Sequence, residues 1–426
     1  MKRVVILCVW LFSVVAGHAQ LSLDECRRLA RENYPEIRQY DLVHQTEQYN
    51  LSNAARAWIP QLAFSAQATW QTDAPNFPKE LTGMLAQQGL EIPGLRKDQY
   101  KVALELNQTI WDGGKSVADK RIARAEAAEQ KTMTDVDLYE LEGRVDDLYF
   151  GILLLDERIA QTNLTLNLLR SNLEKVRALQ RNGVAMQSDA DVLEAELLSV
   201  GQQLIQFESS CDSYRRMLGI FIGQKVGDRK LLRPSAVQPL SGESARPELA
   251  MFAAKIDRLM AQEKMVKSSS MPRLGFFAQG YYGYPGLDYM QSMMNSDWSW
   301  NAMLGVKLSW NFGAYYTQKN NLNKLRTSRQ QVEVQRDVFL FNMNLQAAQE
   351  NGDIARLRKA IADDDRIVAL RLSVREAAES KLRNGIIDTH DLLSKITDES
   401  TASMARSMRE IELLKAIYEY KHTINR

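Results

Sequence analysis

Cysteine is scarce in this sequence, which excludes a fold built on disulfides. Of the 3 cysteines among 426 residues, Cys8 lies in an N-terminal apolar run, and only Cys26 and Cys211 remain beyond it. A disulfide scaffold of this length would be much denser in cysteine. The two thiols could pair in an oxidising compartment, but the sequence favours free thiols.

The sequence also lacks a surplus of positive or negative charge, and it lacks a long apolar helix. The formal net charge is +1, so a basic surface for nucleic acid is not predicted. Beyond residue 19 no apolar run reaches the roughly 18 residues that a membrane helix needs. The first residues, in contrast, contain Lys2 and Arg3, an apolar run to Val15 and then Ala19, the order of a secretory signal. We expect residues 1–19 to be removed and the chain to act outside the cytoplasm.

The few prolines reveal an internal repeat. Two pairs share one offset and similar contexts, Pro35 with Pro247 and Pro60 with Pro272. Arg-Asn-Gly recurs at a slightly smaller offset, at 181–183 and 383–385. We therefore predict two tandem copies, residues 20–233 and 234–426, of which the first carries about a dozen extra residues in one loop.

Two blocks without proline, 94–233 and 286–426, predict long helices. Residues 115–181 and 314–383 are rich in helix-forming residue types, with apolar residues three and four positions apart. Each helix would span about 100 Å and would need to pack against similar helices. Because the periodicity resumes after each Asn-Gly pair, a helical hairpin is expected in each repeat. The predicted hairpin tips lie near 182–186 and 384–388.

Four segments alternate apolar and polar residues with a period of two. They lie near 61–71, 100–111, 273–284 and 298–312. About ten residues with aromatics toward the ends is the length and pattern of a transmembrane barrel strand. The residues expected to face lipid are Leu62, Phe64, Trp70, Leu104, Leu106, Phe276, Trp300, Leu304, Val306, Leu308 and Trp310.

Four such strands are too few to close a membrane barrel, and an open sheet edge is not tolerated in lipid. Three chains would supply twelve strands, so the pattern favours a trimer. The same alternation occurs in soluble sandwiches, whose apolar face is core, but the remainder of this chain looks helical and offers the strands no further partners. We therefore favour a mixed α/β membrane protein, in which a β-barrel continues into a barrel of coiled helices.

At this point the sequence resembles the TolC-like family of outer-membrane efflux proteins over essentially its whole length beyond the signal. The resemblance depends on an ordered set of short motifs: Leu21-Ser22-Leu23-Asp24-Glu25-Cys26, Tyr34-Pro35-Glu36-Ile37, Ile110-Trp111-Asp112-Gly113-Gly114-Lys115, Asn182-Gly183-Val184-Ala185 and Asn384-Gly385-Ile386-Ile387. The second strand-to-helix corner, Trp310-Asn311-Phe312-Gly313-Ala314, lacks the Asp and the second Gly.

The resemblance implies a homotrimer with a twelve-stranded barrel in the outer membrane of a Gram-negative cell and a helical tunnel in the periplasm. It further implies a passive exit duct of a tripartite efflux or type I secretion system, for small molecules or polypeptides. Its expected partners are a periplasmic membrane-fusion adaptor and an inner-membrane pump of the RND or ABC type. No cofactor is implied.

Asp391, six residues after Gly385, matches the family position whose carboxylate faces the pore at the periplasmic constriction. Threefold symmetry would bring three carboxylates together, an arrangement that attracts cations. The family's second acidic position corresponds to Ser394, so the ring would carry less charge. In the first repeat the counterpart is Asp189 by ungapped count, or Asp191 if the extra residues are looped out. Alternatively, these acids, with Ser188 and Thr389, cap their helices.

The hairpin tips are the expected contact with the adaptor. The tip residues are Asn182, Gly183, Val184, Asn384, Gly385 and Ile386. Glycine at these positions could equally serve the turn alone.

Two other classes compete with the duct. An exported coiled-coil scaffold with a small soluble β-element would leave cells without detergent. An enzyme is disfavoured because the three histidines outside the signal, His44, His390 and His422, show no metal-ligand spacing. His390 and Asp391, as neighbours in a helix, would point about 100° apart and not toward one another.

Overall fold

The computed structural model describes residues 21–90, 92–183, 185–235, 244–384 and 386–425. The predicted signal, Val184 and Gly385 lie outside the described residues. The first half contains α1 (Leu23–Asn33), the 3-10 helix η1 (Pro35–Arg38), α2 (Gln39–Arg56), β1 (Gln61–Trp70), α3 (Lys79–Gln87), β2 (Asp98–Trp111), α4 (Lys115–Arg181) and α5 (Gln187–Ile222). The second half contains α6 (Pro247–Ser268), β3 (Arg273–Tyr284), α7 (Tyr289–Met294), β4 (Ser299–Ser309), α8 (Ala314–Arg383) and α9 (Thr389–Ile424). All four predicted strands are present, and the long helices have the predicted bounds.

The chain forms two compact units, and each takes segments from both halves of the sequence. One unit contains the residues up to Gln39, together with Thr132–Ala250 and Arg336–Arg426. The other contains Tyr40–Lys131 and Met251–Gln335. The boundary between the two sequence repeats, at residues 233 and 234, is therefore no boundary between compact units, and the repeat stays a prediction from the sequence.

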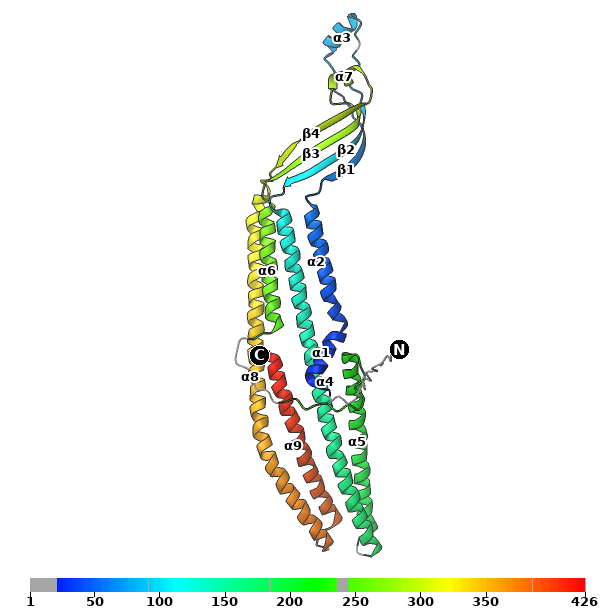
Figure 1. Cartoon of the computed structure of the whole chain (residues 1–426), viewed down its shortest axis with the longest axis vertical. Coiled ribbons are helices and arrows are strands. Elements are labelled where there is room, and N and C mark those ends of the chain that lie inside the picture. The colour runs from blue at the N-terminus through cyan, green and yellow to red at the C-terminus, as the bar shows by residue number, and fades with distance from the viewer. Residues whose placement is uncertain (1–20, 91, 184, 236–243, 385, 426) are drawn as a thin grey trace, which may run out of the picture. The chain divides into compact units, whose positions relative to one another are not determined.

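The strands of the second unit form one antiparallel sheet in the order β1-β2-β3-β4 (Figure 1). Its register aligns side chains of the same face across all four strands. One row runs from Leu62 through Leu106 and Ala278 to Leu304, and the adjacent row runs from Ala63 through Glu105 and Gln279 to Met303. Because successive side chains point to opposite faces, the sheet has one apolar and one largely polar face.

The turn from β2 into α4 contains Asp112, Gly113 and Gly114, and each of them has a defined role in its geometry. Gly113 and Gly114 have φ angles of 70° and 85°, which glycine adopts without strain. The Asp112 carboxylate accepts hydrogen bonds from the backbone N–H of Gly114 at 2.9 Å and of Ser116 at 2.7 Å, and so caps α4.

The second corner is built differently, in line with its different sequence. The Asn311 side-chain oxygen accepts a hydrogen bond from the N–H of Gly313 at 3.0 Å, so asparagine takes part of the role of Asp112. This turn ends β4 at Ser309, whereas the sequence alternation predicted a strand to residue 312. Trp310 therefore lies just beyond the strand, where its indole N–H donates to the Ser270 carbonyl.

The core of the first unit joins both helical hairpins. Leu169 and Leu173 of α4, Leu193 of α5, and Leu392 and Ile396 of α9 belong to one buried apolar cluster. Such burial is the main stabilisation available to helices of this length, because helix propensity alone contributes little. The two cysteines are buried free thiols, in agreement with the expectation from their scarcity.

Candidate functional site

The two hairpin tips of the first unit have turns of equal length. Residues 182–186 connect α4 to α5, and residues 384–388 connect α8 to α9. Asp189 and Asp391 are each the third residue of their helix, so Asp189 is the positional counterpart of Asp391. The extra residues of the first repeat lie instead between β1 and β2, where residues 71–97 correspond to the shorter connection 285–298 between β3 and β4.

The acidic residues near the tips differ in what they contact. The Asp189 carboxylate accepts a hydrogen bond from the Met186 N–H at 2.8 Å, and that of Asp191 accepts one from the Gln187 side chain at 2.7 Å. The Asp391 side chain is exposed and makes no hydrogen bond or ion pair within the described residues. Ser394, one turn further, is exposed as well. Among the three predicted gate acids, Asp391 is thus the one whose exposed carboxylate has no partner within the described residues.

The N-cap of α9 is Asp388, which is not among the caps predicted from the sequence. The Asp388 side chain accepts a hydrogen bond from the Asp391 N–H at 2.8 Å. Thr389, which was considered as a cap, is instead a buried first residue of the helix, and Ser188 is an exposed second residue of α5. An Asp three residues before the next Asp is a recognisable capping pattern, and the adjacent Thr obscured it.

The predicted docking residues that the structure describes, Asn182, Gly183, Asn384 and Ile386, are exposed. Gly183 has a φ of 75°, so a left-handed turn requires glycine there. The Ile386 side chain is 67% exposed, an apolar group at the end of a hairpin. Asn182 and Asn384 are exposed beside them, and the Asn384 side chain donates to the Ser380 carbonyl at 3.0 Å.

The apolar face of the sheet is exposed on the single chain. Most strongly exposed are Leu62, Phe64, Trp70, Trp300, Leu304, Val306 and Leu308, each between 65% and 82%. Leu104 is 49% exposed, while Leu106 and Phe276 on the central strands are half-buried. A continuous apolar surface of this kind requires a partner or a membrane.

Aromatic rings gather at both ends of this sheet. At the end of the β2–β3 pair near Trp70, Trp298 lies 5.8 Å from Tyr100 and 5.3 Å from Tyr282 between ring centroids. At the opposite end the rings of Trp310 and Phe312 lie 4.8 Å apart. Two aromatic belts around an apolar band are typical of a sheet that crosses a bilayer.

The polar face of the sheet is its concave face. A cavity of about 360 Å³ on this side is lined by residues of all four strands, among them Gln61, Asn107, Arg273 and Lys307. On the central strands the side chains of this face are crowded together, with Ala103 2% and Tyr281 7% exposed, whereas Leu104 and Tyr282 on the opposite face are 49% and 38% exposed, as expected where a sheet curves toward its polar face. The apolar face is therefore convex.

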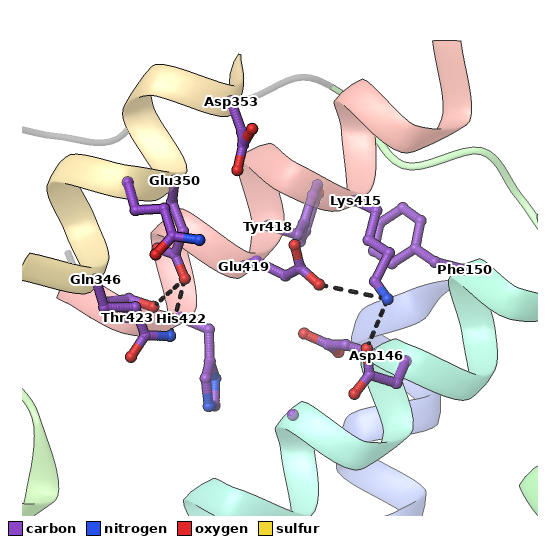
Figure 2. Close-up of a pocket in the computed structure, with 13 residues that line it drawn as sticks. Asp146, Phe150, Gln346, Glu350, Asp353, Lys415, Tyr418, Glu419, His422 and Thr423 are labelled. Carbon is purple, nitrogen blue, oxygen red and sulfur yellow. Dashed lines mark hydrogen bonds and ion pairs between the residues drawn. The ribbon is translucent and has the colours of Figure 1, made fainter. Parts of the chain in front are cut away.

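The first unit contains a second cavity, of about 560 Å³, between α4, α8 and α9 (Figure 2). Lys415 lies between the carboxylates of Asp147 at 2.9 Å and Glu419 at 3.3 Å. Glu350 accepts hydrogen bonds from Thr423 at 2.8 Å and Gln346 at 2.9 Å. These contacts join three helices through polar side chains.

His422 at the edge of this cavity is held as a neutral ring. It stacks on Tyr139 with centroids 4.1 Å apart, and a Cβ at Gly143 would approach its Nε2 to 3.1 Å. Burial, together with the nearby guanidinium groups of Arg246 and Arg27, lowers the pKa of His422 to about 4. The ring serves packing at neutral pH.

The remaining histidines contribute no site. His44 on α2 lies 3.9 Å from Glu47 on the same helix, and His390 is exposed on α9. No group of histidine, cysteine and acidic side chains suited to a metal ion occurs in the described part of the chain. Among the described helices, none has the length and hydropathy to cross a membrane.

Comparisons with known proteins agree with this arrangement. Residues 27–223 match the family model of outer membrane efflux proteins. The outer-membrane channel OprN matches with a TM-score of 0.70 at 14% identity, covering 94% of this chain and 89% of that chain. The outer membrane protein VceC of Vibrio cholerae matches with a TM-score of 0.67 at 15% identity, covering 94% of this chain and 95% of that chain. The open-state MtrE outer membrane channel of Neisseria gonorrhoeae matches with a TM-score of 0.65 at 14% identity, covering 94% of this chain and 88% of that chain. No curated protein matches significantly.

Proposed function

This chain belongs to the outer membrane efflux protein family, and on that premise we propose that three copies assemble into one channel. The protein is an outer-membrane efflux channel that extends into the periplasm of a Gram-negative cell, and it performs no bond chemistry. In the proposed trimer, three four-stranded sheets close a twelve-stranded barrel. The long helices continue it as a tunnel, and cargo passes through without being altered.

The observation that carries this proposal is the curvature of the sheet relative to its two faces. A sheet in a soluble barrel or sandwich buries its apolar face on the concave or inner side. Here the concave side carries Glu105, Gln279 and Lys307, and the convex side carries Leu104, Leu304 and Trp300. That distribution fits a wall with water inside and lipid outside.

Two adjacent residues in the middle of β4 test which face meets lipid. Leu304→Lys places a charge on the convex face, and Met303→Lys places the same charge on the concave face. At the bilayer midplane a lipid-facing lysine costs about 2–4 kcal/mol. Leu304→Lys should therefore reduce the folded fraction recovered in lipid vesicles, measured by urea titration, while Met303→Lys folds as the wild type does.

If both lysine substitutions lowered the folded fraction equally, the assignment of the convex face to lipid would be rejected. A larger loss with Met303→Lys would reverse that assignment and would favour an exported soluble scaffold, whose core is the concave side.

We further propose that Asp391 forms the periplasmic gate, with Ser394 adjacent to it. The support is that its carboxylate is exposed and free of partners, whereas those of Asp189 and Asp191 are held by their own helices. Three copies of Asp391 would attract cations at the constriction. Asp391→Asn should lower the cation preference of the trimer in planar bilayers, and Asp191→Asn should change it little. A selectivity equal to the wild type would remove the gate assignment.

The proposed partners are a periplasmic adaptor at the hairpin tips and, through it, an inner-membrane pump of the RND or ABC type. The support is the exposed apolar Ile386 beside Asn384 at the very end of the second hairpin, and the exposed Asn182 and Gly183 at the first. Val184 and Gly385 complete the tips in sequence. Ile386→Asp should abolish export by intact cells but leave the conductance of the purified trimer unchanged. If the Ile386→Asp variant still exported cargo, Ile386 would be excluded from the adaptor-docking site.

A further inference from the structure

The concave face of the sheet carries more positive than negative charge. The charged side chains at its odd-numbered positions are Lys101, Glu105, Arg273 and Lys307. Three cations and one anion leave an excess of two positive charges per chain.

The one acid on this face is already engaged. The Lys101 ammonium donates to the Gln279 side-chain oxygen at 3.1 Å, and the Gln279 amide in turn donates to Glu105. Gln279 thereby links the two opposite charges across β2 and β3. Lys101 and Glu105 compensate one another and leave Arg273 and Lys307 as the source of the excess.

The other charged groups at the cavity already have hydrogen-bond or ion-pair partners. Lys115 forms an ion pair with Asp119 at 2.9 Å. The Asp112 carboxylate is turned into the start of α4, where it accepts from Gly114 and Ser116. Neither Arg273 nor Lys307 forms an ion pair or a side-chain hydrogen bond within the described residues. Both line the same cavity of about 360 Å³.

The cavity also offers neutral hydrogen-bond donors beside the two cations. Asn107 and Thr109 of β2 and Ser309 of β4 line it with Arg273 and Lys307. Guanidinium with ammonium and hydroxyl donors is the set that binds phosphate and related oxyanions in proteins. We propose that the concave face binds multivalent oxyanions at Arg273 and Lys307, and that phosphate-bearing or similarly anionic solutes are therefore a cargo class of this channel.

The assignment of a cargo class depends on the proposed channel, whereas the binding site does not. In the trimer three such sites would face one lumen and repeat the two charges threefold, an arrangement used by anion-selective pores. The site should hold oxyanions loosely, since solutes must leave a pore again. Its affinity should fall with salt, because both cations are exposed and are screened at high ionic strength.

Binding is tested on the detergent-solubilised full chain with inorganic pyrophosphate as the probe, by isothermal titration at low salt. The double variant Arg273→Gln, Lys307→Gln should bind at least tenfold more weakly than the wild type. A matched control, Lys319→Gln with Arg326→Gln, removes the same two charge types from exposed positions on α8 outside the cavity and should bind as the wild type does. Equal binding by all three proteins, or none by the wild type, would overturn the site.

Conduction is tested with the same three proteins in planar bilayers. Pyrophosphate should reduce the wild-type and control currents at concentrations at least tenfold below those needed for the double variant, and the double variant should shift toward cation selectivity. Equal block of all three would overturn the role of the site in the lumen. If no protein conducts but pyrophosphate binding still depends on Arg273 and Lys307, the proposed channel fails and the oxyanion site stands.

Discussion

The two longest helices have similar composition and length but differ sharply in burial. On α4, apolar residues three and four apart are fully covered, with Leu138, Leu141, Val145 and Ile152 all 0% exposed. On α8 the described buried residues are few, namely Ile354, Leu357, Asp364 and Ala378. The two helices therefore have different roles in the single chain: α4 is a core helix along much of its length, whereas α8 contributes few buried residues.

The exposed apolar residues of α8 are arranged in a regular stripe. Val334, Val338, Phe341 and Leu345 follow one another at intervals of four, three and four residues and are 53–64% exposed. This spacing is that of a coiled-coil seam. We interpret the stripe as the surface that another copy of the chain covers, so that α4 stabilises the protomer and α8 stabilises the assembly.

The largest expected effect is the loss of assembly when this stripe is charged. Phe341→Asp with Leu345→Asp would place two carboxylates in a seam that excludes water, which costs several kcal/mol per unpaired charge. The variant should run as a monomer in native mass measurements and show no conductance. The helix content of the protomer, measured by circular dichroism, should change little because neither side chain contacts its core.

The neighbouring polar residue provides the control. Gln335→Asp introduces a carboxylate on α8, about 100° around the helix from Val334, and should leave the trimer intact. If the double variant still formed a trimer, the exposed stripe of α8 would not be the assembly surface, and the contrast between α4 and α8 would have to be explained in another way.

An intermediate effect is expected at the buried ion pair between α8 and α9. Asp364 is 8% exposed and accepts a hydrogen bond from Arg409. Asp364→Asn removes the charge but keeps the shape, and should lower stability by about 1.5–3 kcal/mol because the hydrogen bond is charge-assisted and buried. Thermal unfolding followed by circular dichroism measures the change.

An exposed ion pair between α4 and α5 provides the control. Arg177 and Glu194 lie 2.6 Å apart and are about half exposed. Arg177→Gln should cost only about 0.2–1 kcal/mol, because water and salt screen the pair. Equal losses of stability in Asp364→Asn and Arg177→Gln would show that the buried ion pair between α8 and α9 stabilises the protein no more than the exposed pair between α4 and α5.

The smallest effect at neutral pH is expected at His422, where α9 packs on α4. Its folded pKa of about 4 lies below the ordinary value of 6.5, so the unfolded chain binds the proton more readily. Stability from this residue is complete above pH 6.5 and is lost as the pH falls toward 4. His422→Gln should flatten the pH dependence of the melting temperature in that window. An unchanged slope would show that the ring is not the group that titrates.

Much of the fold was predictable because it depends on local pattern. The absence of proline gave the long helices, the Asn-Gly pairs gave the hairpin turns, and the period of two gave the four strands with their apolar faces. Errors arose where two local patterns compete. Phe312 continues the alternation of β4, but Asn311 and Gly313 form a turn that ends the strand. At α9 the cap is Asp388, because its side chain reaches the Asp391 N–H while Thr389 is buried.

The sequence by itself determined which residues share a face of a strand or a helix, because that follows from the geometry of each element alone. Tertiary structure decided which face is covered. The apolar stripes of α4 and α8 look alike along the chain, yet the stripe of α4 is covered within the protomer while Val334, Val338, Phe341 and Leu345 of α8 are exposed, so burial depends on what packs there. In the same way, only the pairing of β2 with β3 joins Lys101, Gln279 and Glu105 and leaves Arg273 and Lys307 unpaired. Strand pairing and curvature bring together residues that are distant in sequence, and no local period encodes them.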